Sequence, residues 1–208
     1  SDTDLVLEEN TMKAAVWRGN QSFSIENLPM PTVEPEGVVI KVSASGVCGS
    51  DLHTYRRGGR EGMVKGHEFA GDIVEVGAGV TGVKKGDRVA VMTGRGCGEC
   101  YWCKQGEFIK CAKLQMVGIG FNGAMAEYVS VPNFRFGQYS AKLPDNMSYE
   151  IGATAEPLAV SLYGVQRVQP KPGDTVVVIG LGVIGLGIIQ VLRAMGVKQI
   201  IASGRRAS

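Results

Sequence analysis

Apolar and polar residues alternate along much of the first 145 residues. Between Val38 and Ala44 every even position is apolar, and Lys41 and Ser43 lie between them. A period of two predicts a β-strand with one face on a core. Further strands are predicted where short β-like runs occur, at Lys13–Trp17, Phe23–Ile25, Phe69–Val76, Arg88–Met92 and Ala126–Val131.

Glycine-rich turns separate these runs, for example at Gly77–Gly79 and Lys85–Asp87. Three prolines between residues 29 and 35 exclude a helix there. Gly46–Tyr55 is predicted to turn the chain, and residues 13–145 show no sustained helical periodicity. Many short strands punctuated by glycine predict a closed or partly closed β-barrel.

The pattern becomes helical after Ser148, a residue type that caps helices well. A short helix is predicted over residues 149–155. Because a residue before proline is pushed away from helical angles, we expect Glu156 to leave the helix line before Pro157. A second helix is predicted from Leu158 to Val168, ended by two prolines.

The last segment predicts one βαβ unit. Residues 176–179 are apolar on both faces, as in a buried parallel strand. A glycine turn at 180–185 follows, then apolar residues at helical spacing up to Met195, and a second strand at 199–202. The chain as a whole is therefore predicted to be mixed α/β, with a boundary near residue 155.

Composition narrows the function classes. The 208 residues are 44% hydrophobic and 20% charged, with a net charge of +2 and no basic block. Nucleic acid and membranes are therefore not expected partners. The acidic segment Ser1–Asn10 lacks the positive region of a secretory signal, so a cytoplasmic protein is expected.

Four cysteines have metal-ligand spacing. Cys97, Cys100, Cys103 and Cys111 follow the pattern C-x2-C-x2-C-x7-C. Four thiolates in one short lobe predict a closed structural zinc site. The alternatives are an iron–sulfur cluster, for which the last gap is unusual, and two disulfides, which a reducing compartment disfavours.

A second ligand set is spread along the chain. Cys48, His67 and either Glu68 or Glu156 would bind a catalytic zinc ion and leave one position open. Ser50 and His53 lie close to Cys48 in sequence and suit a proton relay from an alcohol bound at this site. The alternative is that Ser50 caps a turn and His53 is a surface residue.

The glycine turn predicts dinucleotide binding, since a strand precedes it and a helix follows it. Its residues are Gly180, Leu181, Gly182, Val183, Ile184 and Gly185. After the second strand, where an acid would select NAD, the chain has Ser203, Gly204, Arg205 and Arg206. The arginines favour NADP(H). NAD(H) with two solvated arginines is the alternative.

Taken together, these motifs resemble the zinc-containing medium-chain dehydrogenase/reductase family. Cys48-Gly49-Ser50-Asp51-x-His53, Gly66-His67-Glu68, the four-cysteine lobe and the glycine turn occur in family order. Glu156-Pro157-Leu158 resembles the sorbitol (polyol) and butanediol dehydrogenase branch. The resemblance implies that Cys48, His67 and Glu68 bind catalytic zinc and that Glu156 joins the metal or holds its water.

The family resemblance also implies an architecture and an activity. Residues 1–155 would form a GroES-like β-barrel catalytic domain, and 156–208 the start of an incomplete Rossmann domain. The reaction would be reversible hydride transfer between a secondary alcohol, polyol or ketone and NAD(P), in a homo-oligomer when full length. The alternative is a non-catalytic zinc-stabilised binding module with a vestigial nucleotide site.

Overall fold

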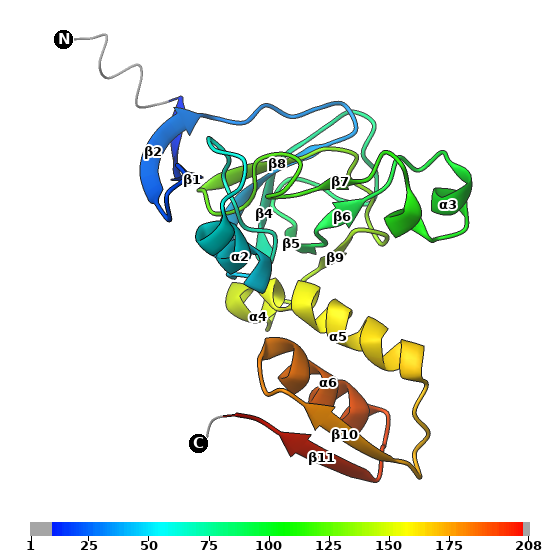
Figure 1. Ribbon diagram of the computed structural model, residues 1–208. Helices are drawn as coiled ribbons and strands as arrows, with labels where there is room; N and C mark the ends of the chain where they lie inside the picture. The colour runs from blue at the N-terminus through cyan, green and yellow to red at the C-terminus, as the bar shows by residue number, and fades with distance from the viewer. Residues whose placement is uncertain (1–9, 206–208) are drawn as a thin grey trace, which may run out of the picture. The chain divides into compact units, whose positions relative to one another are not determined.

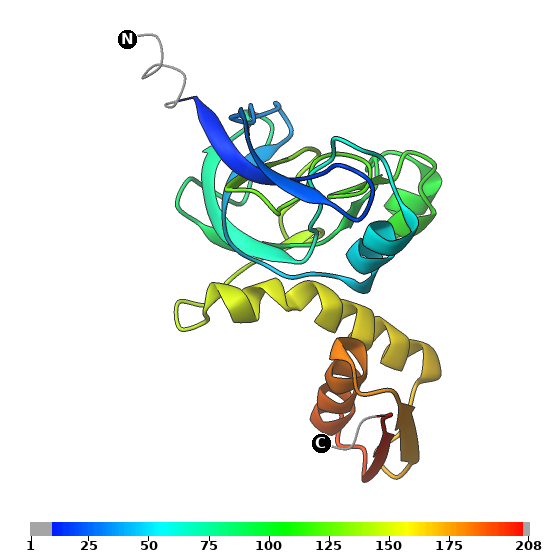
Figure 2. The ribbon, with the colours of Figure 1, turned by 60° about the vertical axis from the view of Figure 1, so that its left-hand side comes forward.

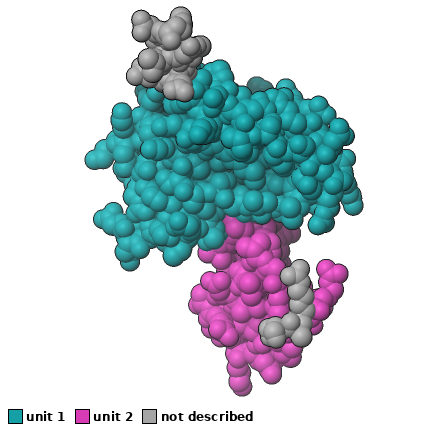
Figure 3. Space-filling model, turned by 90° about the vertical axis from the view of Figure 1, so that its left-hand side faces the viewer, with its two compact units in different colours: residues 1–154 teal, residues 155–208 magenta. Residues whose placement is uncertain are grey.

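The computed structural model describes residues 10–205 and divides the chain into two compact units, Ser1–Thr154 and Ala155–Ser208 (Figures 1 and 3). Two of the segments predicted from the sequence fall outside the described residues. They are Ser1 to Glu9, which is most of the acidic N-terminal segment, and Arg206. The mixed α/β fold predicted from the sequence is confirmed.

The first unit is built around a five-stranded antiparallel sheet. Its strand order is β8 (Tyr128–Val131), β3 (Val38–Ser45), β4 (Phe69–Val76), β5 (Arg88–Val91) and β9 (Ser140–Lys142). Alternating apolar residues of these strands form its core, including Val38, Ile40, Phe69, Ile73, Val89, Val129 and Val131. Pairing of β3 with β4 is irregular near Val39 and near Val42, so both Val39 and Ile40 are buried despite the predicted alternation.

Two smaller antiparallel pairs complete the β-structure of this unit. The hairpin of β1 (Thr11–Trp17) and β2 (Phe23–Pro29) is drawn in blue in Figure 2. The second strand runs beyond the predicted Phe23–Ile25. The strands β6 (Gly94–Arg95) and β7 (Gln115–Met116) were not predicted, because two residues are too few to show a period.

The prediction of a simple turn over Gly46–Tyr55 is wrong. The chain forms helix α2 (Gly49–Arg57) there, with Cys48 as its N-cap. The buried Asp51 carboxylate accepts a hydrogen bond from the Cys48 backbone N–H at 3.0 Å, which closes a capping box. Since local capping starts this helix and its residues are mostly polar, no apolar stripe predicts it.

The helices after residue 148 follow the prediction in part. Ser148 Oγ accepts a hydrogen bond from Ile151 N at 3.3 Å and caps α4 (Tyr149–Ala153). Helix α5 (Ala155–Val168), however, contains both Glu156 and Pro157 in its first turn. The expected break is therefore wrong, because first-turn residues have no intrahelical partner for the N–H that proline lacks.

The second unit is the predicted βαβ arrangement, joined to α5. Strands β10 (Thr175–Ile179) and β11 (Gln199–Ser203) pair in parallel, and α6 (Val183–Ala194) connects them. Its core contains Val165, Val178, Leu192 and Val197. The expectation of a strand buried on both faces is not met, since Ile179 is 87% and Val177 57% exposed in a two-stranded sheet.

Two short helices lie in the four-cysteine lobe, α3 (Tyr101–Lys104) and η1 (Phe108–Lys110). Among all the helices within residues 10–205, none is long and apolar enough to cross a membrane.

Candidate functional site

The structure brings Cys48, His67 and Glu68 together. Their candidate ligand atoms all lie within 4.8 Å of one another. Pairing of β3 with β4 achieves this, because Ser45 at the end of β3 lies opposite Phe69 at the start of β4. Cys48 follows the first strand, and His67 and Glu68 directly precede the second.

A glycine turn sets the direction of His67. Gly66 has a φ of +94°, and a Cβ on it would lie 2.9 Å from the Met125 backbone nitrogen. Its carbonyl accepts a hydrogen bond from Ala124 N at 2.9 Å. Only glycine adopts this conformation at so close an approach without strain, so the turn holds the ring beside Cys48.

The residues of this cluster fit a metal ion. His67 and Glu68 are 4% and 8% exposed, and His67 Nδ1 has no hydrogen-bond partner among the described residues. A buried polar atom without a partner is costly. A thiol, an imidazole and a carboxylate are a donor set typical of zinc. A divalent ion bound by these three residues would compensate the burial of their polar groups.

The predicted relay residues lie on α2. Ser50 Oγ is 3.5 Å from His67 Nε2, which places this hydroxyl at the edge of the cluster. His53 is one helical turn further on and exposed to solvent. Glu156 belongs to the second unit, so its approach to the cluster stays a prediction. The sequence analysis assigned no role to Asp51. Its spacing from Cys48 could have indicated that it caps helix α2.

The four-cysteine lobe forms a second cluster. The sulfurs of Cys97, Cys100, Cys103 and Cys111 lie within 4.8 Å of one another, and all four cysteines are free. Backbone N–H groups of Cys100 and Cys97 donate to the sulfurs of Cys97 and Cys111, each at 3.4 Å. Such N–H···S bonds support ligands around a bound metal. Their arrangement fits the predicted structural zinc site.

Two thiols of this lobe differ in acidity. A hydrogen bond from the Glu99 backbone lowers the pKa of Cys97 to about 6, whereas burial raises the pKa of Cys103 to about 12. Four thiols so close together cannot all ionise without a compensating cation. A divalent ion would supply that compensation.

The second unit has a cleft at the carboxyl ends of its strands. It measures about 580 Å³ and is lined by Ile179, Gly180, Leu181, Gly182, Ser203, Gly204 and Arg205. Val183 and Ile184 form the start of α6 and do not line it. A Cβ on Gly185 would overlap the Gly180 carbonyl oxygen. The structure thus joins the predicted glycine turn and the end of β11 in one concave site.

Two glycine substitutions should separate folding from binding in this cleft. Gly185→Ala forces α6 away from the turn, so we expect a lower melting temperature and loss of dinucleotide binding.

A Cβ on Gly182 meets nothing within 4 Å, and the φ of Gly182 is −81°. Gly182→Ala should therefore fold normally but weaken binding at least about tenfold, since the methyl obstructs a pyrophosphate. Thermal unfolding and dinucleotide titration would test this, and equal melting temperatures of the two variants would contradict it.

Known proteins resemble this chain in sequence. Residues 34–145, more than half of the chain, match the family described as alcohol dehydrogenase GroES-like domain. The sorbitol dehydrogenase of Bacillus subtilis (strain 168) is 37% identical over 199 residues, covering 92% of this chain and 55% of that protein. The chain belongs to the zinc-containing medium-chain dehydrogenase/reductase family, in its sorbitol dehydrogenase-like branch.

Two solved structures extend the likeness across both units. An alcohol dehydrogenase of Escherichia coli CFT073 solved with NADH is 35% identical with a TM-score of 0.86, covering 95% of this chain and 58% of that one. A protein of Sinorhizobium meliloti 1021 bound to NADP is 35% identical with a TM-score of 0.85, covering 95% and 57%. This member of the medium-chain family thus spans little more than half the length of these relatives.

Proposed function

We propose that this chain forms the metal-binding part and the start of the dinucleotide site of an NAD(P)-dependent dehydrogenase. Its reaction is reversible hydride transfer between a secondary alcohol or polyol and the dinucleotide. The observation that carries the proposal is the cluster of the half-buried Cys48 with the buried His67 and Glu68, whose ligand atoms lie within 4.8 Å of one another. The sorbitol dehydrogenase of B. subtilis supports the polyol class.

The residues of the cluster and those around it divide into metal ligands and proton-transfer residues. Cys48, His67 and Glu68 would hold a zinc ion, with Glu156 joining it or holding its water. When bound, zinc supplies Lewis acidity that lowers the pKa of a hydroxyl. Ser50 lies beside His67, so its hydroxyl would accept the proton of the substrate while donating its own proton to His53. His53, exposed on the same helix, would then release a proton to water.

The cleft of the second unit supports NADP(H) as the cofactor. Arg205 lines it together with Gly204, and no acidic residue is among its lining residues. A guanidinium recognises a phosphate bidentately, whereas NAD selection relies on a carboxylate at this position. The solved relatives bind NADH in one case and NADP in the other.

The test is a substrate and cofactor panel with the full-length protein. We expect oxidation of secondary alcohols or polyols, faster with NADP than with NAD, because Arg205 pairs with the 2′-phosphate. Arg205→Ala should weaken NADP binding about tenfold, the value of a charge-assisted hydrogen bond, and leave NAD binding unchanged. Steady-state kinetics and dinucleotide titrations would measure both. Equal or tighter binding of NAD by the unaltered protein would refute the cofactor assignment, and no turnover of any alcohol would refute the activity.

A further inference from the structure

Arg95 in β6 is a buried cation without a counter-charge in the described part of the chain. It is 1% exposed, and its Nε and Nη1 have no hydrogen-bond partner there. Its Nη2 donates to the Met92 carbonyl at 3.3 Å. Burial lowers the pKa of Arg95 to about 10, so the guanidinium is still charged at neutral pH. Burying a charge without pairing it is unfavourable.

The surroundings of Arg95 show where its side chain lies. Arg95 is directly opposite Gln115 in the antiparallel pair β6–β7, and opposite residues of such a pair project to the same face. Its guanidinium carbon lies 5.4 Å from the centre of the Phe121 ring. Gln115 and Phe121 both line one cavity of the first unit. Arg95 is not itself a lining residue, and the Phe121 ring lies next to both the guanidinium and the cavity.

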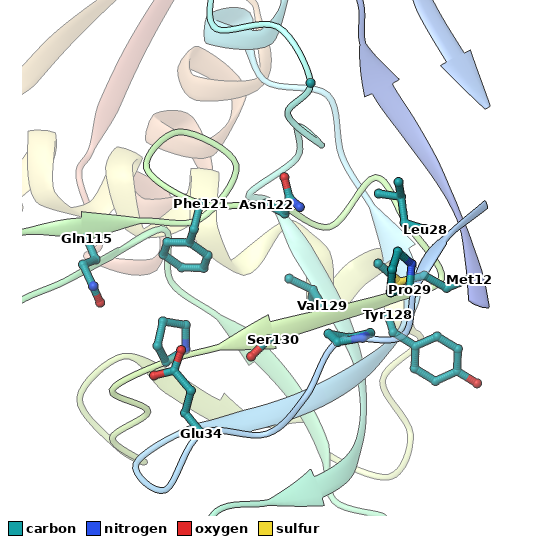
Figure 4. Close-up of a pocket in the computed structure, with 14 residues that line it drawn as sticks. Met12, Leu28, Pro29, Glu34, Gln115, Phe121, Asn122, Tyr128, Val129 and Ser130 are labelled. Atoms are coloured by element: carbon teal, nitrogen blue, oxygen red, sulfur yellow. The ribbon is translucent and has the colours of Figure 1, made fainter. Parts of the chain in front are cut away.

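The cavity is of a size that holds small molecules. It measures about 480 Å³, within the range of about 300–1,000 Å³ found for ligand sites. Phe121, Gln115 and Glu34 lie toward one end, and Met12, Leu28, Pro29 and Tyr128 toward the other (Figure 4). None of the candidate metal ligands or relay residues is among its lining residues.

We propose that this cavity binds a small organic anion, whose carboxylate or phosphate pairs with Arg95 while its apolar body packs on Met12, Leu28 and Val129. The Phe121 ring contacts the guanidinium and lines the cavity, so it must shift for the two charges to meet. The Glu34 carboxylate at the same end is exposed. Its repulsion of an anion is therefore screened by water, whereas the buried guanidinium acts at low dielectric.

The proposal goes beyond dehydrogenase activity, because its residues belong neither to the metal cluster nor to the dinucleotide cleft. Binding of the anion requires no metal, no dinucleotide and no turnover. A direct binding measurement can therefore show no anion binding while the proposed dehydrogenase reaction still holds. Equally, the anion can bind although the proposed reaction is not observed.

Calorimetric titration with three probes would test the site. Hexanoate carries the charge and an apolar body, hexanamide the body alone, and inorganic phosphate the charge alone. We expect one hexanoate per chain, bound at least about tenfold tighter than hexanamide, as a charge-assisted hydrogen bond predicts. Phosphate should bind more weakly than hexanoate because it leaves the apolar walls uncovered. The Arg95 Nε–H resonance should shift on addition of hexanoate.

Variants give the matched comparison. Arg95→Gln should remove the preference for hexanoate over hexanamide, and Glu34→Gln, in the same cavity, should keep or increase it. If Arg95→Gln does not fold, Arg95→Lys and the unaltered protein decide the question. Equal affinities for hexanoate and hexanamide, an Arg95 resonance that does not move, or phosphate binding as tight as hexanoate would each overturn the proposal.

Discussion

Cys48→Ala in the full-length protein is expected to lower kcat/KM for alcohol oxidation by at least about a thousandfold. Lewis acidity from a bound metal is worth several kcal/mol, and each 1.36 kcal/mol is a factor of about ten. The substitution removes one of three ligand atoms that the structure holds within 4.8 Å. The remaining His67 and Glu68 should no longer retain zinc, so the metal content should fall from two ions to one per chain.

Metal analysis and steady-state kinetics on the same preparation would measure both effects. Leu52→Ala is the matched control, since Leu52 lies on the same helix, is 46% exposed and offers no ligand atom. It should retain two zinc ions and nearly full activity. A Cys48→Ala protein with unchanged turnover would instead favour a non-catalytic module.

Cys103→Ser is expected to have the largest effect on stability. The lobe around it has little apolar core, because Tyr101, Trp102 and Ile109 are 68%, 41% and 62% exposed. Structural zinc binding contributes about 10–16 kcal/mol in small zinc domains. Loss of even about 4 kcal/mol would lower the melting temperature of a chain of this size by roughly 8–16 °C.

Calorimetry combined with zinc analysis would test this second expectation. Cys103→Ser should lose the structural ion and keep the one at Cys48. Lys104→Ala, a substitution of the neighbouring exposed residue, should change neither quantity. An unaltered melting temperature in Cys103→Ser would show that packing, not metal, holds the lobe.

Segments with a sustained period were predictable from the sequence. Phe69–Val76 has the bounds that were predicted, and the βαβ order of the second unit is as expected. In these segments neighbouring side chains carry the signal, since burial on one face repeats at fixed intervals. The four-cysteine lobe is similar, because its ligands lie within 15 consecutive residues, 97–111.

Local rules failed where a specific contact outweighed them. Helix α2 starts from the capping contact between Cys48 and Asp51 rather than from an apolar stripe. Glu156 remains helical because the first turn of a helix accommodates proline. A hydrogen bond at the helix terminus decided the first case. In the second, the first-turn position decided it, since no intrahelical hydrogen bond is lost there, and periodicity reports neither effect.

The sequence alone therefore determined the residue types, the four-cysteine spacing and the glycine turn. Only the tertiary structure decided that Cys48 and His67, 19 positions apart, meet at the paired ends of β3 and β4. It also decided that Arg95 is buried with no counter-charge among residues 10–205. The physical reason is that pairing between distant strands sets which side chains face one another and which lose water, and neither follows from the order of residues along one strand.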